Sequence, residues 1–460
     1  MHAVMILLAV ATLCMPALSP PDQSSGGCGF VLGFATLHDL IPTVVGDCVD
    51  DEGHNPDNGD ALQHTTGGLL VWRKADNFTA FTDGASSWIN GPDGVQRRPN
   101  SQRFSWEANP EGLPLVEVST VPQATVVAQG LVTPWAIAFL PDGRMLVTER
   151  PGRVRVIIGG QLQASPWLTV PAIEQAGGET GLMGLDVDPN FARNHFVYAY
   201  YTYRAGGLVN RLVRLRDDQG TGVVDSVLLD GIPGALYHDG GRVRFGPDSK
   251  LYLTVGDALT PTSAQNLGSL NGKILRMNAD GSVPDDNPYP GSLVYASGFR
   301  NAEGLAWHPV TGQLYVSVHG PSSGPPDCCH DAISLVTPGS NYGWPTVFGM
   351  NGDARYRQPI LESGLQTWAP GGIAFGLQGP WTNTLLVTEL RGQQLRVVHL
   401  AAPGYGVVTG QDVWFDQSLG RLRDVVTGPD GALYLLTSNR DGRGTPQAGD
   451  DKVLRVTFGS

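Results

Sequence analysis

A short motif that recurs six times constrains the fold of this 460-residue chain more than any other feature. Each copy ends a strand, makes a turn of the Pro-Asp-Gly type, and continues into bulky residues typical of a buried strand. The clear copies read FLPDGRMLVT, FGPDSKLYLT, WHPVTGQLYVS and TGPDGALYLLT, and weaker copies cover residues 187–199 and 375–388. Successive motif prolines lie 48 to 71 positions apart, which suits a four-stranded propeller blade with its loops. We therefore predict an all-β chain with a six-bladed β-propeller over residues 125–460.

The two ends of the repeat region indicate how such a ring closes. The last strand-like run, VLRVTF at 453–458, can pair with TVVA at 125–128, and this pairing removes an exposed sheet edge. Two β-sandwiches are the alternative all-β arrangement, but they fit the periodic turns less well.

The region before residue 125 differs in composition. Residues 1–25 hold an apolar run followed by small residues and prolines, as in a secretory signal peptide with its leader. Residues 26–107 are polar, aromatic and rich in turns, so we expect a small module with a helical or extended start over 30–45 and β-hairpins after it. Residues 108–124 contain three prolines and are interpreted as a linker. The role of the module stays open between an anchor and a carbohydrate contact.

Charge and hydropathy exclude several classes of partner. The formal net charge is −13 and no run of Lys or Arg forms a basic stripe, which argues against nucleic acid. After the leader, no stretch approaches the ~20 apolar residues of a membrane span. The chain also lacks a Walker loop, a dinucleotide fingerprint and a nucleophile elbow, which argues against a nicotinamide enzyme and a serine hydrolase.

Cysteine placement agrees with a secreted or periplasmic location. Cys28 and Cys48 flank one short segment and could pair in an oxidising compartment. Cys328 and Cys329 are adjacent, and they form either a vicinal disulfide or two free thiols or bonds elsewhere.

Polar clusters interrupt the repeat, and propellers bind ligands on such loops at the mouth of the central channel. His238 lies in YHDGGR, where a neutral imidazole can act as a general base; a hydrogen-bonded structural histidine is the alternative. Arg300 and Asn301 lie in GFRNAEG, and together they can polarise a carbonyl; a surface Arg-Glu pair is the alternative.

Two further clusters indicate a cation and a polycarboxylate. The carbonyls of Gly320–Pro321, followed by a long loop with Asp331, suit a hard cation such as Ca²⁺, although a plain surface loop is the alternative. Arg421 and Arg423 lie two positions apart, so in a strand both guanidiniums face the same side. With Arg391 nearby they could bind a polycarboxylate; a solvated basic edge is the alternative.

Segments that match a known protein family occur in the same order across all six repeats. The chain resembles the soluble quinoprotein glucose dehydrogenases and aldose sugar dehydrogenases from about residue 126 to 458. The matching segments are GLVTPWAIAFLPDGRMLVTERPGRVRVI, GETGLMGLDVDPNF, HDGGRVRFGPDSKLYLTVGD, LGSLNGKILRMNADGSVPDDNPY, GFRNAEGLAWHP, HGP, SNYGWP and RLRDVVTGPDGALYLLT.

The resemblance implies that the chain uses pyrroloquinoline quinone (PQQ) and Ca²⁺. It implies that His238 takes the proton of the sugar's anomeric hydroxyl while a hydride passes from that carbon to the quinone. Arg300 and Asn301 would polarise the quinone carbonyl and hold the cofactor, and the Gly320 and Pro321 carbonyls would hold the Ca²⁺. The two arginines of RLRD would pair with the cofactor's carboxylates.

Several positions depart from the best-known glucose enzyme of that family. Glu179 stands where that enzyme has Gln, and a carboxylate near a trianionic cofactor is unfavourable unless it is protonated or paired. Tyr237 replaces an Asp before the base, and Arg391 replaces a Lys in the cofactor site. Ala332 falls where a carboxylate supports a second calcium, although Asp331 remains.

The function implied by the resemblance is PQQ- and calcium-dependent oxidation of an aldose to its lactone, with electrons passed to an external acceptor. The alternative is a non-catalytic propeller that binds a carbohydrate or protein partner on the same scaffold. A third hypothesis, a calcium-dependent propeller lactonase, needs a ring of acidic and Asn ligands that the sequence does not show.

Overall fold

The computed structural model describes residues 28–458, apart from 75, 92, 93, 110, 117–120, 323–327 and 378. The predicted leader, residues 1–25, lies outside the described residues. Regular structure is almost entirely β-strand, which confirms the prediction of an all-β chain. The described helices are short: α1 (Leu32–Leu40), α2 (Pro42–Val45), α3 (Phe191–Asn194) and the 3₁₀ turns η1 (Pro261–Gln265) and η2 (Gly379–Trp381). None of them is long and apolar enough to span a membrane.

Six antiparallel sheets follow one another between residues 122 and 458. The first holds β8 (Pro134–Phe139), β9 (Met145–Glu149), β10 (Arg153–Ile158), β11 (Gln161–Leu162) and β12 (Leu168–Thr169), and the second holds β13 (Leu182–Val187), β14 (Phe196–Arg204), β15 (Leu208–Asp218) and β16 (Thr221–Pro233). The third holds β17 (Val243–Phe245), β18 (Leu251–Val255), β19 (Lys273–Met277) and β20 (Val294–Ser297), and the fourth holds β21 (Asn301–Trp307), β22 (Leu314–His319), β23 (Ala332–Val336) and β24 (Leu361–Glu362). The fifth holds β25 (Pro370–Phe375), β26 (Leu385–Glu389), β27 (Gln394–Leu400) and β28 (Val408–Trp414), and the sixth holds β29 (Leu422–Thr427), β30 (Leu433–Thr437), β31 (Lys452–Phe458) and β7 (Pro122–Gln129).

Each copy of the repeated motif forms the turn between the first two strands of its sheet. In the turn from β8 to β9, the Leu140 N–H donates to the Arg144 carbonyl at 2.8 Å, and the Gly143 N–H donates back to the Leu140 carbonyl at 3.0 Å. Gly143 has a φ of +86°, which a residue with a Cβ adopts only with strain. The same pair of bonds recurs in the turns at 246–250 and 428–432, whereas the short helices α3 and η2 lie between the first two strands of the second and fifth sheets.

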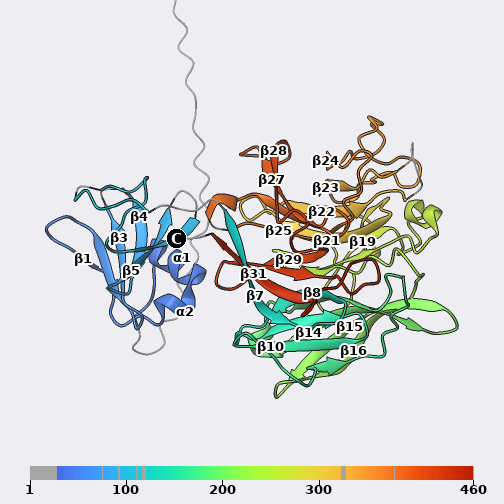
Figure 1. Cartoon of the computed structure of the whole chain (residues 1–460), viewed down its shortest axis with the longest axis horizontal. Coiled ribbons are helices and arrows are strands. Elements are labelled where there is room, and N and C mark those ends of the chain that lie inside the picture. Colours follow the sequence, from blue (N-terminus) through green and yellow to red (C-terminus); the bar gives the residue numbers. More distant parts are fainter. Residues whose placement is uncertain are drawn as a thin grey trace, which may run out of the picture.

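The six sheets form a closed ring. The first strand of each sheet packs against the first strand of the next sheet, except that β21 contacts β18, the second strand of the third sheet. The first strand of the last sheet, β29, packs against the first strand of the first sheet, β8. The sixth sheet is completed by the N-terminal strand β7, which pairs antiparallel with β31 with Val453 opposite Ala128 and Arg455 opposite Thr125 (Figure 1). The predicted pairing of the two chain ends is thus confirmed.

This topology gathers particular chain segments at one edge of the ring. In an antiparallel pair, the start of one strand lies beside the end of its neighbour. Residues just before a first strand and just after a second strand therefore share an edge. Most of the candidate site residues occupy such positions: Glu179, His238, Arg300 and Arg421 before β13, β17, β21 and β29, and Gly320 and Arg391 after β22 and β26.

A separate six-stranded sheet precedes the ring and lies beside it (Figure 1). Its strands, in chain order, are β1 (Gly53–His54), β2 (Ala61–His64), β3 (Leu69–Arg73), β4 (Phe78–Thr82), β5 (Ser86–Gly91) and β6 (Gly94–Pro99). Helix α1 packs on this sheet, so that Phe34 and Leu37 are buried with Leu70 and Phe81. A disulfide joins Cys28 to Cys48 at the start of this region, as the spacing predicted.

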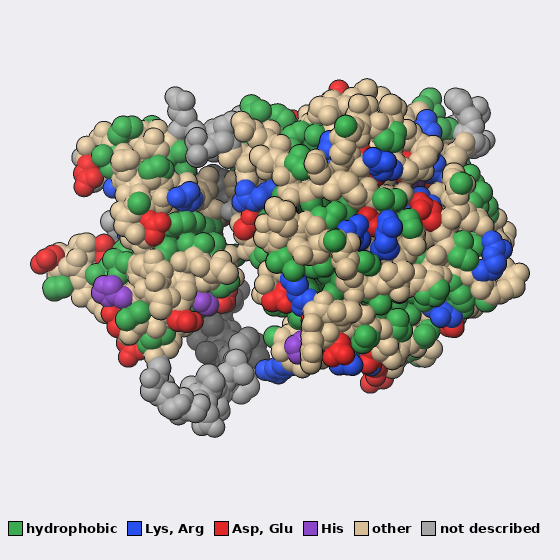
Figure 2. Space-filling view, turned by 60° about the horizontal axis from the view of Figure 1, so that its bottom comes forward, with side chains coloured by type: hydrophobic (Ala, Val, Ile, Leu, Met, Phe, Trp, Pro, Cys, Tyr) green, Lys and Arg blue, Asp and Glu red, His purple; other side chains and the backbone are tan. Residues whose placement is uncertain are grey.

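Charges of both signs are interspersed over the face shown in Figure 2, where Lys and Arg side chains alternate with Asp and Glu.

Candidate active site

A cavity of about 600 Å³ opens at the edge of the ring where these segments meet. Nine of the ten predicted site residues line it: Glu179, His238, Arg300, Gly320, Pro321, Asp331, Arg391, Arg421 and Arg423. Asn301 is fully buried and is not part of the wall. Residues that lie up to 244 positions apart in the chain therefore share one chamber of the size of a small-molecule site.

His238 forms a chain of hydrogen bonds that fixes its ring. Its Nδ1 lies 2.8 Å from Oδ1 of Asp257, which is fully buried. The other oxygen, Oδ2, accepts a bond of 2.8 Å from Nε1 of Trp344. An Asp that accepts from Nδ1–H leaves the lone pair of Nε2 for another proton. His238 is thus held as a base whose second nitrogen can serve the cavity.

The backbone at His238 is unusual for a residue with a side chain. Its φ is +65°, in the left-handed region, and Gly240 and Gly241 follow with φ of +68° and +108°. Non-glycine residues in this region cluster at functional sites, where surrounding contacts hold them. One such contact is the bond of 2.9 Å that the His238 N–H donates to Oε2 of Glu179.

A carboxylate at position 179 was expected to be unfavourable near an anionic cofactor unless it is protonated or paired. In the structure Glu179 is paired. Its Oε1 accepts a bond of 3.1 Å from Nη1 of Arg443. Burial alone would raise the pKa of Glu179, but the positive charge of His319, the His238 N–H and Arg443 together lower it to about 2. Glu179 is therefore an ionised and neutralised carboxylate at neutral pH.

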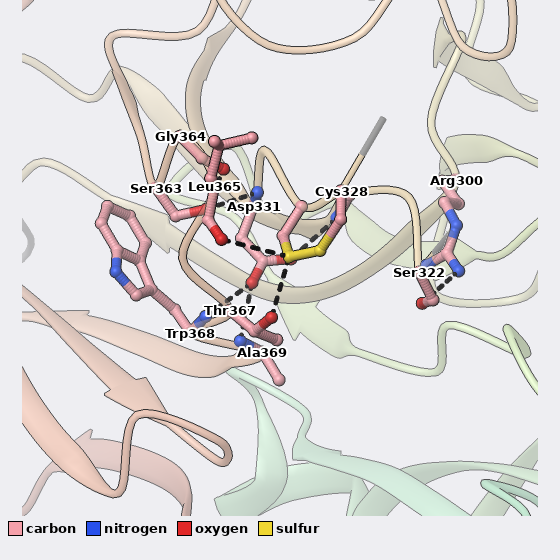
Figure 3. The surroundings of a disulfide bond; sticks show 12 residues. Arg300, Ser322, Cys328, Asp331, Ser363, Gly364, Leu365, Thr367, Trp368 and Ala369 are labelled. Carbon is pink, nitrogen blue, oxygen red and sulfur yellow. Dashed lines mark hydrogen bonds between the residues drawn. A yellow bond between two sulfur atoms is a disulfide. The ribbon is translucent and has the colours of Figure 1, made fainter. Parts of the chain in front are cut away.

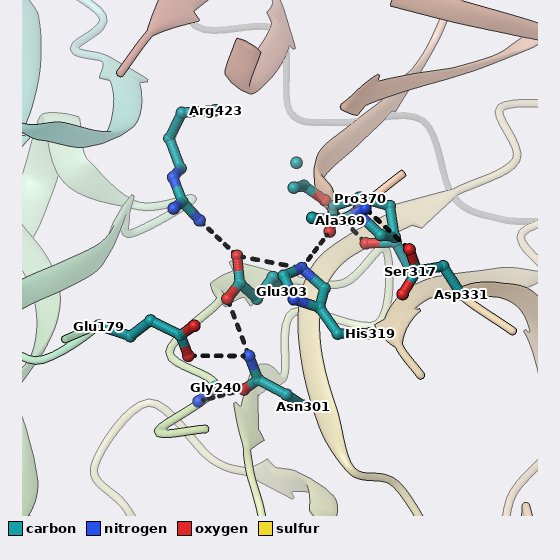
Figure 4. Close-up of polar contacts among 12 residues, drawn as sticks. Glu179, Gly240, Asn301, Glu303, Ser317, His319, Asp331, Ala369, Pro370 and Arg423 are labelled. Atoms are coloured by element: carbon teal, nitrogen blue, oxygen red, sulfur yellow. Dashed lines mark hydrogen bonds and ion pairs between the residues drawn. The ribbon is translucent and has the colours of Figure 1, made fainter. Parts of the chain in front are cut away.

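Asn301 is fully occupied by protein partners (Figure 4). Its Oδ1 accepts from the Gly240 N–H at 2.9 Å, and its Nδ2 donates to Oε1 of Glu303 at 2.9 Å and to Glu179 at 3.4 Å. The amide therefore ties the loop of the base to the floor of the cavity. These bonds favour a positioning role for Asn301 over the predicted contact with a carbonyl in the cavity.

Glu303 is the centre of a polar cluster in the wall of the cavity (Figure 4). Besides Asn301, it binds Nη1 of Arg423 and lies 3.6 Å from Nε2 of His319, which also contacts the Pro370 carbonyl at 3.0 Å. One carboxylate thus orients three side chains that come from β21, β22 and β29.

The arginines of the cavity differ in how many donors they have left. Arg421 uses Nε and Nη2 on Oδ2 of Asp441 and donates from Nη1 to the Leu390 carbonyl. Arg423 uses Nη1 on Glu303, and neither its Nη2 nor the Arg391 guanidinium has a hydrogen-bond partner among the described residues. These donors and the positive charge suit an anionic ligand with several carboxylates.

Arg300 lines the same cavity as the base. Its Nη2 donates to Oγ of Ser322 at 2.9 Å, and its guanidinium lies 5.7 Å from the centre of the Trp344 ring. Burial lowers the pKa of Arg300, with Asp257 and Glu179 opposing this effect. Trp344 contacts both Asp257 and Arg300, so one side chain orders the base and the cation together.

Gly320 and Pro321 line the cavity, and no hydrogen-bond donor to their carbonyl groups is found in the described part of the chain. Asp331 does not offer a free carboxylate beside them. Its Oδ1 accepts from the Gly320 N–H at 2.8 Å, and its Oδ2 accepts from the N–H groups of Trp368 and Ala369 at 2.7 and 2.8 Å. These three bonds indicate that Asp331 positions Gly320, and its role as a direct metal ligand stays a prediction. The described residues contain no group of three or more His, Cys, Asp or Glu that could hold a metal ion.

Sequence reasoning missed several residues that complete the site. Asp257 directly follows β18, at the edge where the other candidates lie, so its position after a second strand was the available signal. Glu303 lies two positions after Asn301 in β21, which favours the same face of the strand. Trp344 lies in the quoted segment SNYGWP but was given no role, and Arg443 carried no such signal because it reaches the cavity from a long loop.

The comparisons agree with this geometry. Residues 131–446 match the family model described as Glucose / Sorbosone dehydrogenase. An aldose sugar dehydrogenase of Escherichia coli K12, YliI, is 31% identical over 69% of this chain and 90% of its own length. Quinoprotein glucose dehydrogenase B of Acinetobacter calcoaceticus is 28% identical over 72% of this chain and 88% of its own.

A solved structure is similar over the same region. The PQQ-bound form of aldose sugar dehydrogenase from Streptomyces coelicolor superposes with a TM-score of 0.66 at 33% identity, covering 74% of this chain and all of that one. The family model spans more than half of the chain and includes every candidate site residue. The chain therefore belongs to the glucose/sorbosone dehydrogenase family.

Proposed function

We propose that this protein oxidises an aldose at its anomeric carbon to the lactone, with PQQ and Ca²⁺ as cofactors, and passes the electrons to an external acceptor. One observation carries the proposal: a single cavity unites a histidine held by a buried aspartate with a set of guanidinium groups. A base and an anion-binding wall in one chamber are what a quinone-dependent sugar oxidation requires.

The residues present fit PQQ, a flat tricarboxylate. The cavity is large enough for it, and Arg391 and Arg423 have donors left for carboxylates, while Arg421 keeps two of its five N–H groups. Arg300 would hold the quinone end beside the base. When bound, PQQ supplies the two-electron acceptor for the hydride that leaves the anomeric carbon.

The fit to Ca²⁺ rests on the carbonyls of Gly320 and Pro321. Ca²⁺ takes six to eight oxygen ligands, and two carbonyls without a hydrogen-bond donor can supply two of them. Oxygens of the cofactor and water would supply the others, because Asp331 is engaged by three N–H groups. We therefore expect Ca²⁺ to bind together with the cofactor.

The roles of the chain's own groups follow from their positions. His238 accepts the proton of the anomeric hydroxyl on Nε2, and Asp257 and Trp344 hold the imidazole in the orientation that presents this atom. Asp257 also stabilises the imidazolium that results. Glu179 and Asn301 hold the backbone of residues 238–240, so that the base does not drift from the cavity.

We also propose that the ring is a six-bladed β-propeller over residues 125–460, preceded by a module at 26–107 and a linker at 108–124. The closed order of six sheets and the pairing of β7 with β31 support the first part. The separate core of the six-stranded sheet supports the second. Two disulfides support a secreted or periplasmic location.

Reconstitution with PQQ and Ca²⁺ tests the proposal. Purified protein should reduce a redox dye when it is given aldoses, and His238→Gln should lower turnover by about 100-fold or more with little loss of PQQ affinity. Binding of PQQ without turnover of any aldose would favour the non-catalytic alternative. Similarity to Hedgehog-interacting protein of mouse, 28% identical over 35% of this chain and 28% of that protein's own length, is the observation that favours a protein partner under this alternative.

A further inference from the structure

A disulfide between adjacent residues, Cys328 and Cys329, forms part of the cavity wall (Figure 3). Cys328 lines the same chamber as His238 and Arg300, and Cys329 is buried behind it. The sequence left this bond open, and the proposed function assigns it no role. A small reductant that enters the cavity can reach the sulfur of Cys328.

The backbone after the disulfide packs directly on Gly320. A Cβ atom placed on Gly320 would lie 1.8 Å from the Cys329 carbonyl oxygen and 2.6 Å from that of His330. Only glycine permits this approach. The position of the Gly320 carbonyl therefore depends on where the chain at Cys329 and His330 runs.

The same segment is tied to the neighbouring loop at 363–369. The N–H groups of Cys329 and His330 donate to the Gly364 carbonyl at 3.3 and 2.8 Å. Sγ of Cys329 lies 2.9 Å from Oγ1 of Thr367, whose hydroxyl is the donor while the sulfur is in the disulfide. Asp331, two residues further, bonds both Gly320 and this loop. The disulfide thus sits at the junction of the two segments that frame Gly320.

We infer that the Cys328–Cys329 disulfide is a redox-sensitive positioning element of the cofactor cavity, and that its reduction weakens the binding of PQQ and Ca²⁺ at Gly320–Pro321. The inference rests on the proposed function for the identity of those ligands. An external dithiol carries out the reduction: the S–S bond breaks, two S–H bonds form, and the dithiol becomes a disulfide. A disulfide between neighbours restricts the backbone of both, so its opening frees the chain that packs on Gly320.

The second disulfide of the chain provides the control for the effect of reduction. Cys28–Cys48 lies in the N-terminal sheet region and does not line the cavity. The full-length double variant Cys28→Ser/Cys48→Ser keeps the vicinal disulfide, whereas Cys328→Ser/Cys329→Ser lacks it. Thiol counting by mass spectrometry establishes the redox state of each sample.

Hydrogen exchange without cofactor tests the positioning role by itself. On reduction, the amides of Gly320, His330 and Ala369 should exchange at least about tenfold faster in the Cys28→Ser/Cys48→Ser protein, and reoxidation should reverse the change. Cys328→Ser/Cys329→Ser should show the fast exchange with or without reductant. Unchanged exchange in samples in which mass spectrometry shows both Cys328 and Cys329 as free thiols overturns the inference.

Equilibrium dialysis of PQQ at fixed Ca²⁺ tests the consequence for binding. The dissociation constant should rise about tenfold or more on reduction, and equal affinity of the oxidised and reduced forms overturns the inference. If the oxidised protein binds no PQQ, the proposed function fails, and the exchange measurement still decides whether the disulfide positions Gly320.

Discussion

Nδ1 of His238 and Oδ1 of Asp257 lie 2.8 Å apart, and they join the segment before β17 to the segment after β18. The contact sets which imidazole nitrogen carries the proton, so Asp257→Asn should permit the wrong tautomer. We expect kcat for aldose oxidation to fall by about 100-fold while KM changes little. Steady-state dye reduction by the reconstituted enzyme measures both constants.

Trp344→Phe is the matched control for this change. It removes the bond to Oδ2 of Asp257 and leaves the bond between Asp257 and the imidazole. Its effect on kcat should be clearly smaller than that of Asp257→Asn. Equal losses in the two variants would show that Asp257 acts through general packing and not through the tautomer.

Arg391 should contribute to cofactor affinity and not to the chemical step. Its guanidinium lines the cavity and has no side-chain partner in the described part of the chain, so removal leaves no buried carboxylate unpaired. Arg391→Gln should raise the dissociation constant of PQQ about tenfold, with kcat at saturating cofactor unchanged. Arg193→Gln, at an exposed position outside the cavity, should leave affinity unaltered. A lowered kcat with normal PQQ affinity would contradict the assignment.

The sequence predicted the all-β fold because the turn between the first two strands recurs with closely similar residues at 140–144, 246–250 and 428–432. It predicted most of the cavity wall because strand ends at one edge carry polar clusters. The pairings within the site were not predictable, since they join segments far apart in the chain, such as Arg443 with Glu179. The roles of Asn301 and Asp331 also depended on such pairings, because neighbouring N–H and carboxylate groups occupy both side chains.

Glu179 should contribute to stability under acid conditions. Its pKa is about 2 in the folded protein against 4.5 when unperturbed, so its contribution is complete above about pH 4.5 and is lost as the pH falls towards 2. Glu179→Gln should remove this component, which amounts to roughly 1–3 kcal/mol. Urea unfolding at several pH values between 6 and 3 measures it. Parallel curves for the two proteins over this range would contradict the ionised pair with Arg443.

Asp239 follows the base in the chain. We expect its ionisation to make folding stability fall with rising pH, the opposite of the effect of Glu179 and at higher pH. Its Oδ1 accepts from Nδ2 of Asn210 at 2.7 Å, its Oδ2 is buried without a partner among the described residues, and burial raises its pKa to about 7. Between about pH 4 and 7 the unfolded chain releases this proton and the folded protein keeps it, so stability falls as the pH rises and levels off above 7.

The variant Asp239→Asn tests this dependence because its side chain does not titrate. Its thermal unfolding midpoint should fall less between pH 5 and 7 than that of the unmodified protein, by a few degrees. Asp451, whose pKa burial also raises to about 7, keeps part of the slope in both proteins. Identical pH profiles would mean that Asp239 is already ionised in the fold, with a buried water or cation compensating its charge.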